Sequence, residues 1–457
     1  MASSPSLAGF SLTSEGATAG LRAARERTLE LVAGIENRDL ERLHSPLMSP
    51  LAWDLGHIAA YEDLWLAHRH GGLPLLHPEL ASCYDAFETP RARRSEAQWL
   101  RPAAARAYMA EVRARVLEVI AREGLGDGTL HEMVIQHERQ HNETMLQTLG
   151  LARLDYHRPA SLPAPAAPAG GASFTGLGYV EVPGGPFELG APPERFSYDN
   201  ERPAHPVEVE SFEIGVTPVT NGAWLEWIRQ GGYDRRECWS DAGWEFSQGA
   251  GLRHPGGWIP APDEELGFRE WRTGGAAPLA PERPVVHVSW FEAQAFARSH
   301  GARLPTEAEW ERAATFDASS ETKLAWPWGD ARESDDTRPR RSRITGAQDP
   351  VARANFIERR LWGTAPVGAF PAGAAPSGVL GMLGDVWEWT GSDFNEYPGF
   401  EAHPYREYSE VFFGDRYKVL RGGSWASSER VATPTFRNWD LPQRRQIFAG
   451  LRLARDL

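Results

Sequence analysis

Three things are scarce in this sequence of 457 residues: cysteine, long apolar runs and basic residues, of which there are 48 against 62 acidic ones. The only cysteines are Cys83 and Cys238, which excludes a disulfide framework and a cysteine-based zinc site. No run approaches the ~18 apolar residues that span a bilayer, so we expect no membrane span. No basic segment followed by an apolar one opens the chain, so we expect no secretory signal.

The net charge of −14 argues against a nucleic-acid partner, because nucleic-acid-binding proteins normally carry a basic surface. It favours a monomer, since like charges on two copies repel. With few cysteines and no export signal, the cytoplasm is the expected compartment. A content of 41% apolar and 24% charged residues is typical of folded domains, and the length predicts two or three of them.

Residues 1–158 predict a helical domain. Apolar residues recur with the helical period in four stretches that are rich in good helix formers: 13–36, 49–68, 98–123 and 129–149. Four such stretches predict a four-helix bundle, whose interior is a usual place for metal ligands. The uncharged residues 159–174, rich in Pro, Ala and Gly, predict a linker.

Residues 175–457 predict a loop-rich α+β domain, because most of the 18 tryptophans lie here among frequent glycines and prolines. The sequence predicts short strands at 179–182, 206–214, 285–288 and 417–421, and helices at 220–230 and 290–300. Thr306 followed by Glu309 marks the capped start of a further helix.

The strongest chemical signal is the pair His137 and His141 in the stretch HERQH. Side chains four residues apart lie on one face of a helix, so both imidazoles can reach one metal ion. The stretch also fits H-E-x-x-H, in which Glu138 would serve as the base of a zinc metalloprotease. Histidines that bind no metal are the third interpretation of this segment.

His57 lies in the middle of the apolar stretch 49–68 and is a plausible third ligand. Three neutral imidazoles leave coordination positions open and suit Fe(II), Zn and Cu about equally. Glu143 is placed to orient one of the ligands. His131 lies off the face of the histidine pair, so we expect it to be structural.

The sequence contains no P-loop, no G-x-G-x-x-G after a strand and no nucleophile elbow. It does contain, in order, EVPGG at 181–185, RLPTEAEW at 303–310, GDVWEW at 384–389, RGGSW at 421–425 and FAGLR at 448–452. These motifs resemble the formylglycine-generating-enzyme (sulfatase-modifying-factor) domain, a variant of the C-type lectin fold. The histidine-bearing helices resemble a DinB-like domain.

The pairing of these two domains resembles the iron-dependent sulfoxide synthases of ergothioneine biosynthesis, over nearly the whole chain. The most specific stretches are SPLAWDLGHI, HERQHNET and FRNWDLPQRRQIFAG. The resemblance implies a multidomain α and α+β protein that binds Fe(II) through His57, His137 and His141 and uses O₂ as co-substrate. It also implies that hercynine, a trimethylated histidine, contacts four residues: Gln140, Asn438, Trp439 and Asp440.

The thiol substrate of the best-known members, γ-glutamylcysteine, carries two carboxylates, which arginines bind bidentately. The resemblance points to Arg91, Arg94 and Arg444, with Arg93 close enough to leave the choice within the first cluster open. It also points to Tyr405 and Tyr408 as the pair that contains the active-site acid. The cysteine chemistry of the formylglycine-generating enzymes is not expected, because Cys238 lies outside any matching motif.

The expected function is therefore formation of a C–S bond between hercynine and the thiol of γ-glutamylcysteine, or of cysteine, with oxygenation of the sulfur. The alternative within the same chemistry is a selenoneine synthase that joins hercynine to a selenosugar. A zinc-dependent hydrolase is less favoured, and a non-catalytic binding module is least favoured because it gives the three histidines no task. The sequence leaves the sulfur or selenium donor open.

Overall fold

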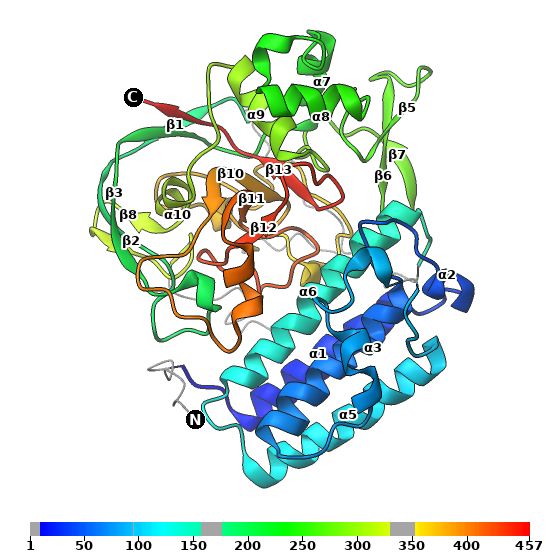
Figure 1. Cartoon of the computed structure of the whole chain (residues 1–457). Helices are drawn as coiled ribbons and strands as arrows, with labels where there is room; N and C mark the ends of the chain where they lie inside the picture. The colour runs from blue at the N-terminus through cyan, green and yellow to red at the C-terminus, as the bar shows by residue number, and fades with distance from the viewer. Residues whose placement is uncertain (1–9, 95, 157–175, 330–351) are drawn as a thin grey trace. The chain divides into compact units, whose positions relative to one another are not determined.

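The computed structural model describes residues 10–94, 96–156, 176–329 and 352–457 (Figure 1). The chain forms two compact units. The helical unit comprises Met1–Pro159 with the short pieces Pro193–Phe196 and Thr273–Gly275, and the β-rich unit comprises the rest. The linker predicted at 159–174 lies outside the described residues, and the predicted domain boundaries stay a prediction.

The helical unit contains four long helices, one for each stretch in which the sequence predicted a helix. They are α1 (Ser14–Leu31), α3 (Leu51–Glu62), α5 (Pro102–Glu123) and α6 (Thr129–Ala152). Shorter helices are α2 (Asn37–Glu41) and α4 (Ala81–Tyr84), with 3₁₀ turns at Pro78–Leu80 and Arg91–Arg93. Helix α3 contacts both α5 and α6, and α1 contacts α6 (Figure 1).

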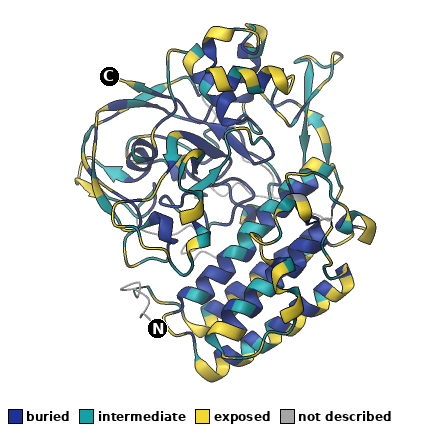
Figure 2. Cartoon of the chain, in the orientation of Figure 1, coloured by how far each residue is buried: buried dark blue, intermediate teal, exposed yellow. Residues whose placement is uncertain are grey.

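Helix α3 is the central helix of this unit. Every residue from Leu51 to Ala59 is buried, as expected for a helix that is apolar on all sides (Figure 2). It continues without a break into a π-helix at Asp63–His70. By contrast, α5 buries one stripe of residues at helical spacing, including Met109, Val112 and Val116.

The β-rich unit contains small sheets rather than one large one. Its strands are β1 (Tyr179–Val182), β2 (Gly185–Leu189), β3 (His205–Val209), β4 (Phe212–Gly215), β5 (Trp258–Pro260), β6 (Phe268–Arg272), β7 (Gly275–Pro278), β8 (Phe316–Asp317), β9 (Thr322–Lys323), β10 (Trp387–Phe394), β11 (Gly414–Arg421), β12 (Asn438–Asp440), β13 (Ala449–Leu451) and β14 (Ala454–Asp456). The four-stranded sheet has the order β12-β11-β10-β13, and the three-stranded sheets are β1-β4-β14 and β5-β6-β7. Two further pairs, β2-β3 and β8-β9, are antiparallel.

Four helices accompany these sheets: α7 (Asn221–Arg229), α8 (Asp241–Gly249), α9 (Trp290–Ser299) and α10 (Glu307–Thr315). The helices predicted at 220–230 and 290–300 are confirmed as α7 and α9. The predicted cap of α10 is confirmed too: the Thr306 hydroxyl accepts the N–H of Glu309, whose carboxylate accepts the N–H of Thr306.

Two strand predictions in this unit need correction. The stretch 206–214 is two strands, β3 and β4, because the chain turns between Val209 and Phe212. The stretch 285–288 is not a strand: His287 takes a positive φ of 64°, which breaks the extended run. Val285 and Val288 each give a single backbone hydrogen bond, to Val219 and Ala449.

The tryptophans that made this part of the sequence unusual form much of its core. Trp310 is fully buried and its indole N–H donates to Glu388 at 2.7 Å. Trp389 is fully buried and donates to the carbonyl of Val288 at 2.9 Å. Each indole thus adds a large apolar area while its one polar atom is satisfied.

Candidate metal centre

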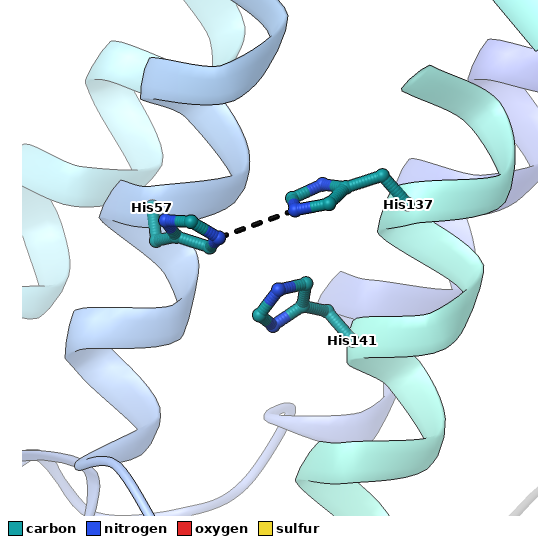
Figure 3. Close-up of side chains that lie close together, drawn as sticks. All are labelled: His57, His137 and His141. Carbon is teal, nitrogen blue, oxygen red and sulfur yellow. Dashed lines mark hydrogen bonds between the residues drawn. The ribbon is translucent and has the colours of Figure 1, made fainter. Parts of the chain in front are cut away.

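Three histidines of the helical unit converge on one point (Figure 3). His57 comes from α3, and His137 and His141 come from successive turns of α6. One ring nitrogen of each lies within 4.8 Å of the others, and the Nε2 atoms of His57 and His137 are 3.2 Å apart. These are the three residues that the sequence predicted as ligands.

His57 is held in one orientation and one tautomer. Its Nδ1 lies 2.7 Å from the carbonyl oxygen of Tyr84, which can only accept, so Nδ1 carries the proton. Its ring stacks on Trp53, with centroids 4.7 Å apart and an interplanar angle of 12°. A Cβ on Gly56 would lie 2.1 Å from the Tyr84 ring, so glycine is required for this approach. The unprotonated Nε2 therefore faces the other two histidines.

His137 is held by the ring of Tyr61, which stacks on it at a centroid distance of 3.7 Å. Burial lowers the pKa of His57 and of His137 well below the usual value, and the neighbouring imidazoles act in the same direction. Both rings are therefore neutral at physiological pH. Neutral imidazole is the form that ligates a metal.

The donor set fits a divalent transition metal. Ligand nitrogens lie ~2.0–2.1 Å from such an ion, which places neighbouring ligand atoms roughly 3 Å apart, as the two Nε2 atoms are. Three imidazoles fill three positions and leave the rest for substrate or oxygen. Within the described residues no other group of three metal-ligating side chains is found.

Glu138 of the H-E-x-x-H stretch faces away from the histidines. Its carboxylate pairs with Arg25 at 2.8 Å and with Arg113 at 3.3 Å, and it accepts the Thr28 hydroxyl at 2.7 Å. Glu62 completes this buried network through the same two arginines. A glutamate bound in this way is not placed to act as the base of a zinc protease, which needs to face the metal-bound water.

The other residues predicted in the helical unit differ in their surroundings. Arg94 is buried, its Nε donates to the Thr89 carbonyl, and its guanidinium lies over the Trp53 ring at 3.6 Å. Arg91 is half-buried and donates to the Leu47 carbonyl at 3.2 Å. Gln140 is half-buried on α6, next to His141.

Two further predictions in this unit concern carboxylate and histidine. Glu143 is buried on α6, and its role as an orienting group stays a prediction. The carboxylate that lies beside the histidines is that of Asp54, which the sequence analysis did not single out. His131 is fully buried and away from the cluster, beside the ring of His70 at 4.9 Å, which agrees with a structural role.

The residues predicted in the β-rich unit gather around β12. This strand carries Asn438, Trp439 and Asp440, and Arg444 pairs with Asp440 at 3.4 Å. The Trp439 ring stacks on Phe394 at 4.2 Å and meets the Tyr408 ring edge-on at 5.9 Å. The Tyr405 ring meets Tyr408 edge-on at 6.2 Å. Segments about 30 residues apart in sequence are thus brought together.

Comparison with known proteins agrees with this division. The DinB superfamily model matches residues 21–145, and the model of the sulfatase-modifying factor enzyme 1-like domain matches residues 167–457. The hercynine oxygenase of Mycolicibacterium smegmatis is 46% identical over 96% of this chain and 98% of its own. That of Mycobacterium tuberculosis is also 46% identical, with the same coverage. The formylglycine-generating enzyme of Mycobacterium tuberculosis is 33% identical over 49% of this chain and 76% of its own.

A helical DinB domain with a three-histidine cluster, joined to a β-rich sulfatase-modifying-factor domain, defines a two-domain class of protein. The hercynine oxygenases match this chain over both domains. The chain belongs to the hercynine oxygenase family. No helix in the described part of the chain combines the length and apolarity that crossing a membrane would take.

Proposed function

We propose that this protein is an Fe(II)- and O₂-dependent sulfoxide synthase of ergothioneine biosynthesis. It joins hercynine to the thiol of γ-glutamylcysteine, or of cysteine, and oxygenates the sulfur. The observation that carries the proposal is the convergence of His57, His137 and His141 in a chain that matches hercynine oxygenases over nearly its full length. When bound, Fe(II) would supply a redox-active ion with open coordination positions, through which electrons from the substrates can reach O₂.

The overall reaction balances with O₂ alone. Hercynine loses a C–H bond and the thiol loses its S–H bond. One oxygen atom ends on the sulfur, and the other leaves as water with both hydrogens. The two substrates supply four electrons, which O₂ accepts, so no external reductant is needed.

The tyrosines of the β-rich unit serve as the proton donor in this proposal. A phenol has a pKa of ~10, so at neutral pH it holds a proton that it can give up to reduced oxygen. Tyr405 is the first candidate. Tyr408 is the second, because its ring is already packed between Tyr198 at 4.2 Å and Trp439 at 5.9 Å.

Hercynine is assigned to Gln140, Asn438, Trp439 and Asp440. A trimethylammonium group is attracted by an aromatic face and by negative charge, and Trp439 and Asp440 are consecutive residues of β12 that offer both. The amide side chains of Gln140 and Asn438 can donate to the carboxylate of hercynine.

The carboxylates of the thiol substrate are assigned to Arg91, Arg94 and Arg444. Two buried guanidinium nitrogens of Arg444, Nε and Nη1, have no hydrogen-bond partner within the described residues, and the Arg444–Asp440 pair is long at 3.4 Å. An anionic substrate would satisfy these donors. Arg93 is exposed, which favours Arg91 and Arg94 over it as the pair in the first cluster.

Finer features of the fold belong to the same proposal. We interpret the four long helices as the four-helix bundle of a DinB domain and the β-rich unit as a C-type lectin variant, with boundaries at 1–158 and 175–457. The protein is proposed to act as a cytoplasmic monomer.

Anaerobic reconstitution with Fe(II), followed by O₂ and hercynine with one donor at a time, tests the function. γ-Glutamylcysteine, cysteine and a selenosugar are the donors, and mass spectrometry reads the products. We expect a hercynyl sulfoxide with γ-glutamylcysteine or cysteine. Product from the selenosugar alone would establish the selenoneine alternative. Peptide hydrolysis by zinc-loaded protein with no coupled product would overturn the proposal, although the orientation of Glu138 speaks against that outcome.

A further inference from the structure

One buried carboxylate beside the histidine cluster lacks hydrogen-bond partners within the described residues. Asp54 lies on α3, one turn before His57, and is fully buried. Its Oδ1 is 3.5 Å from Nδ1 of His141. Neither carboxylate oxygen of Asp54, and not Nδ1 of His141 either, has a hydrogen-bond partner in the part of the chain that the structure describes.

Three other buried carboxylates of this unit, Glu62, Glu138 and Asp63, have charged partners. Glu62 and Glu138 each pair with two arginines. Asp63, on the π-helix that continues α3, pairs with Arg115 at 3.1 Å and accepts the N–H of Leu76 at 2.8 Å. A buried carboxylate without such partners is costly, because it has lost its hydration. Asp54 differs from these three, because neither of its carboxylate oxygens has a hydrogen-bond partner within the described residues.

Two groups lie near enough to offset the Asp54 charge. One is the Arg94 guanidinium, which stacks on Trp53 and interacts electrostatically with Asp54. The other is the His141 ring, whose Nδ1 lies 3.5 Å from Oδ1 of Asp54. A divalent cation on the histidine cluster would polarise His141 and shorten the contact to Asp54 into a hydrogen bond.

We infer that Asp54 is a positioning residue for the metal: it accepts the Nδ1 proton of His141, fixes the tautomer that leaves Nε2 for the ion, and offsets part of the ion's charge. The inference rests on the proposed metal site. It makes the two helices differ, since His57 donates to the neutral carbonyl of Tyr84, whereas His141 would donate to the Asp54 carboxylate, which lies 3.5 Å away. A charged acceptor makes the imidazole the more basic ligand.

The test measures binding of Co(II) and Zn(II) to the full-length, metal-free protein, by visible absorption and by competition with a chelator. Asp54→Asn keeps the size of the side chain and removes its charge, and Asp54→Ser carries the test should the Asn variant not fold. Asp63→Asn is the matched control, because Asp63 is equally buried but pairs with Arg115. Removal of an orienting partner weakens metal binding by ~10–100-fold.

We expect that weakening for the Asp54 variants, together with a smaller rise in melting temperature on adding Zn(II). Asp63→Asn should keep wild-type affinity and the full metal-induced rise, even if its metal-free form melts lower. Asp54 variants that bind both ions as tightly as wild type would overturn the inference and leave the metal site standing. Wild-type protein that binds neither ion would overturn the proposed site itself.

Discussion

The two faces of helix α6 differ in whether their polar side chains find charged partners within the protein. We call the face with Glu138 and Asn142 the paired face, and the face with His137 and His141 the histidine face. On one face, the Glu138 carboxylate pairs with Arg25 and Arg113, and the Asn142 amide N–H donates to the Thr28 hydroxyl. On the other face, His137 and His141 direct ring nitrogens toward His57 and toward each other, and the Asp54 carboxylate lies beside His141. The same five residues, HERQH, thus contribute to a structural network and to a ligand site. The Glu138 carboxylate, which is paired within the protein, stabilises the fold. The histidine nitrogens, which face one another, are available to a ligand.

The largest effect is expected from a substitution on the histidine face. His137→Ala removes one of three ligands, so we expect iron occupancy to fall sharply and turnover to drop to background. The metal-free protein should keep its fold, because the contacts of His137 within the described residues are with His57, His141 and the Tyr61 ring. Iron content by plasma emission and circular dichroism check the two halves of this prediction. Normal iron content in the variant would remove His137 from the site.

A second comparison, in the β-rich unit, is between the two candidate proton donors. The Tyr408 ring is packed between Tyr198 and Trp439, whereas the Tyr405 ring contacts Tyr408 edge-on. In Tyr405→Phe, phenylalanine keeps the ring and removes the proton donor. Because general acids contribute ~10²–10⁴-fold, we expect a loss of that size in coupled sulfoxide, with iron and both substrates still bound. Oxygen uptake would persist as oxidation of the thiol alone.

Tyr408→Phe is the matched variant. Coupled product at the wild-type rate from Tyr405→Phe, with a loss in Tyr408→Phe, would transfer the role of acid to Tyr408. Product analysis by mass spectrometry, beside an oxygen electrode, separates the two outcomes.

Glu138→Gln tests how much the ion pairs of the paired face contribute to stability. It leaves the buried guanidinium of Arg25 without one of its counter-charges, and breaking a buried pair from one side costs about 3–5 kcal/mol of unfolding free energy. Glu123→Gln is the control, since its pair with Arg122 is exposed at the end of α5 and contributes only ~0.2–1 kcal/mol. Urea unfolding of the metal-free proteins measures both. Equal losses in the two variants would contradict the division between the faces.

The smallest effect is a pH dependence. Burial lowers the pKa of His131 to about 4 from the model-peptide value of 6.5. The unfolded chain therefore takes up a proton near pH 6.5 while the folded chain does not, so stability falls as the pH drops from 6.5 toward 4. The His131 share of the loss is about 2 kcal/mol at pH 5.

His131→Leu should remove that share, because leucine fills a similar volume and does not titrate. Neither ring nitrogen of His131 has a hydrogen-bond partner within the described residues, so the change breaks no such bond. Between pH 7 and pH 5, measured by urea unfolding, the wild type should therefore lose about 2 kcal/mol more stability than the variant. An unchanged difference between the two pH values would show that His131 does not titrate in this way.

The same contrast explains what the sequence could predict. The long helices follow from local periodicity, and the histidine spacing of 137 and 141 places both rings on one face, so the ligands could be named in advance. The orientation of Glu138 could not, because it depends on Arg25 and Arg113 from other helices. The role inferred for Asp54 likewise depends on how α3 packs against α6.

In the β-rich unit the sequence predicted less, because its elements depend on distant partners. Strand β10 pairs in parallel with β13, joining Trp387 to Ala449, and no local pattern encodes such a pairing. The apolar run at 285–288 suggested a strand, but its hydrogen bonds go to separate segments and His287 has a left-handed backbone. Capping boxes, which are local, were predicted correctly at Thr306. The substrate residues of this unit came from family resemblance, and their roles stay predictions.

The central claim is that His57, His137 and His141 together hold one Fe(II). X-ray absorption at the iron edge of the anaerobically loaded protein tests it most directly, because imidazole rings give a characteristic multiple-scattering pattern. The account predicts one iron per chain with three imidazole ligands, falling to two in His57→Ala at whatever iron is retained. An iron shell without imidazole, or one unchanged by His57→Ala, would contradict it.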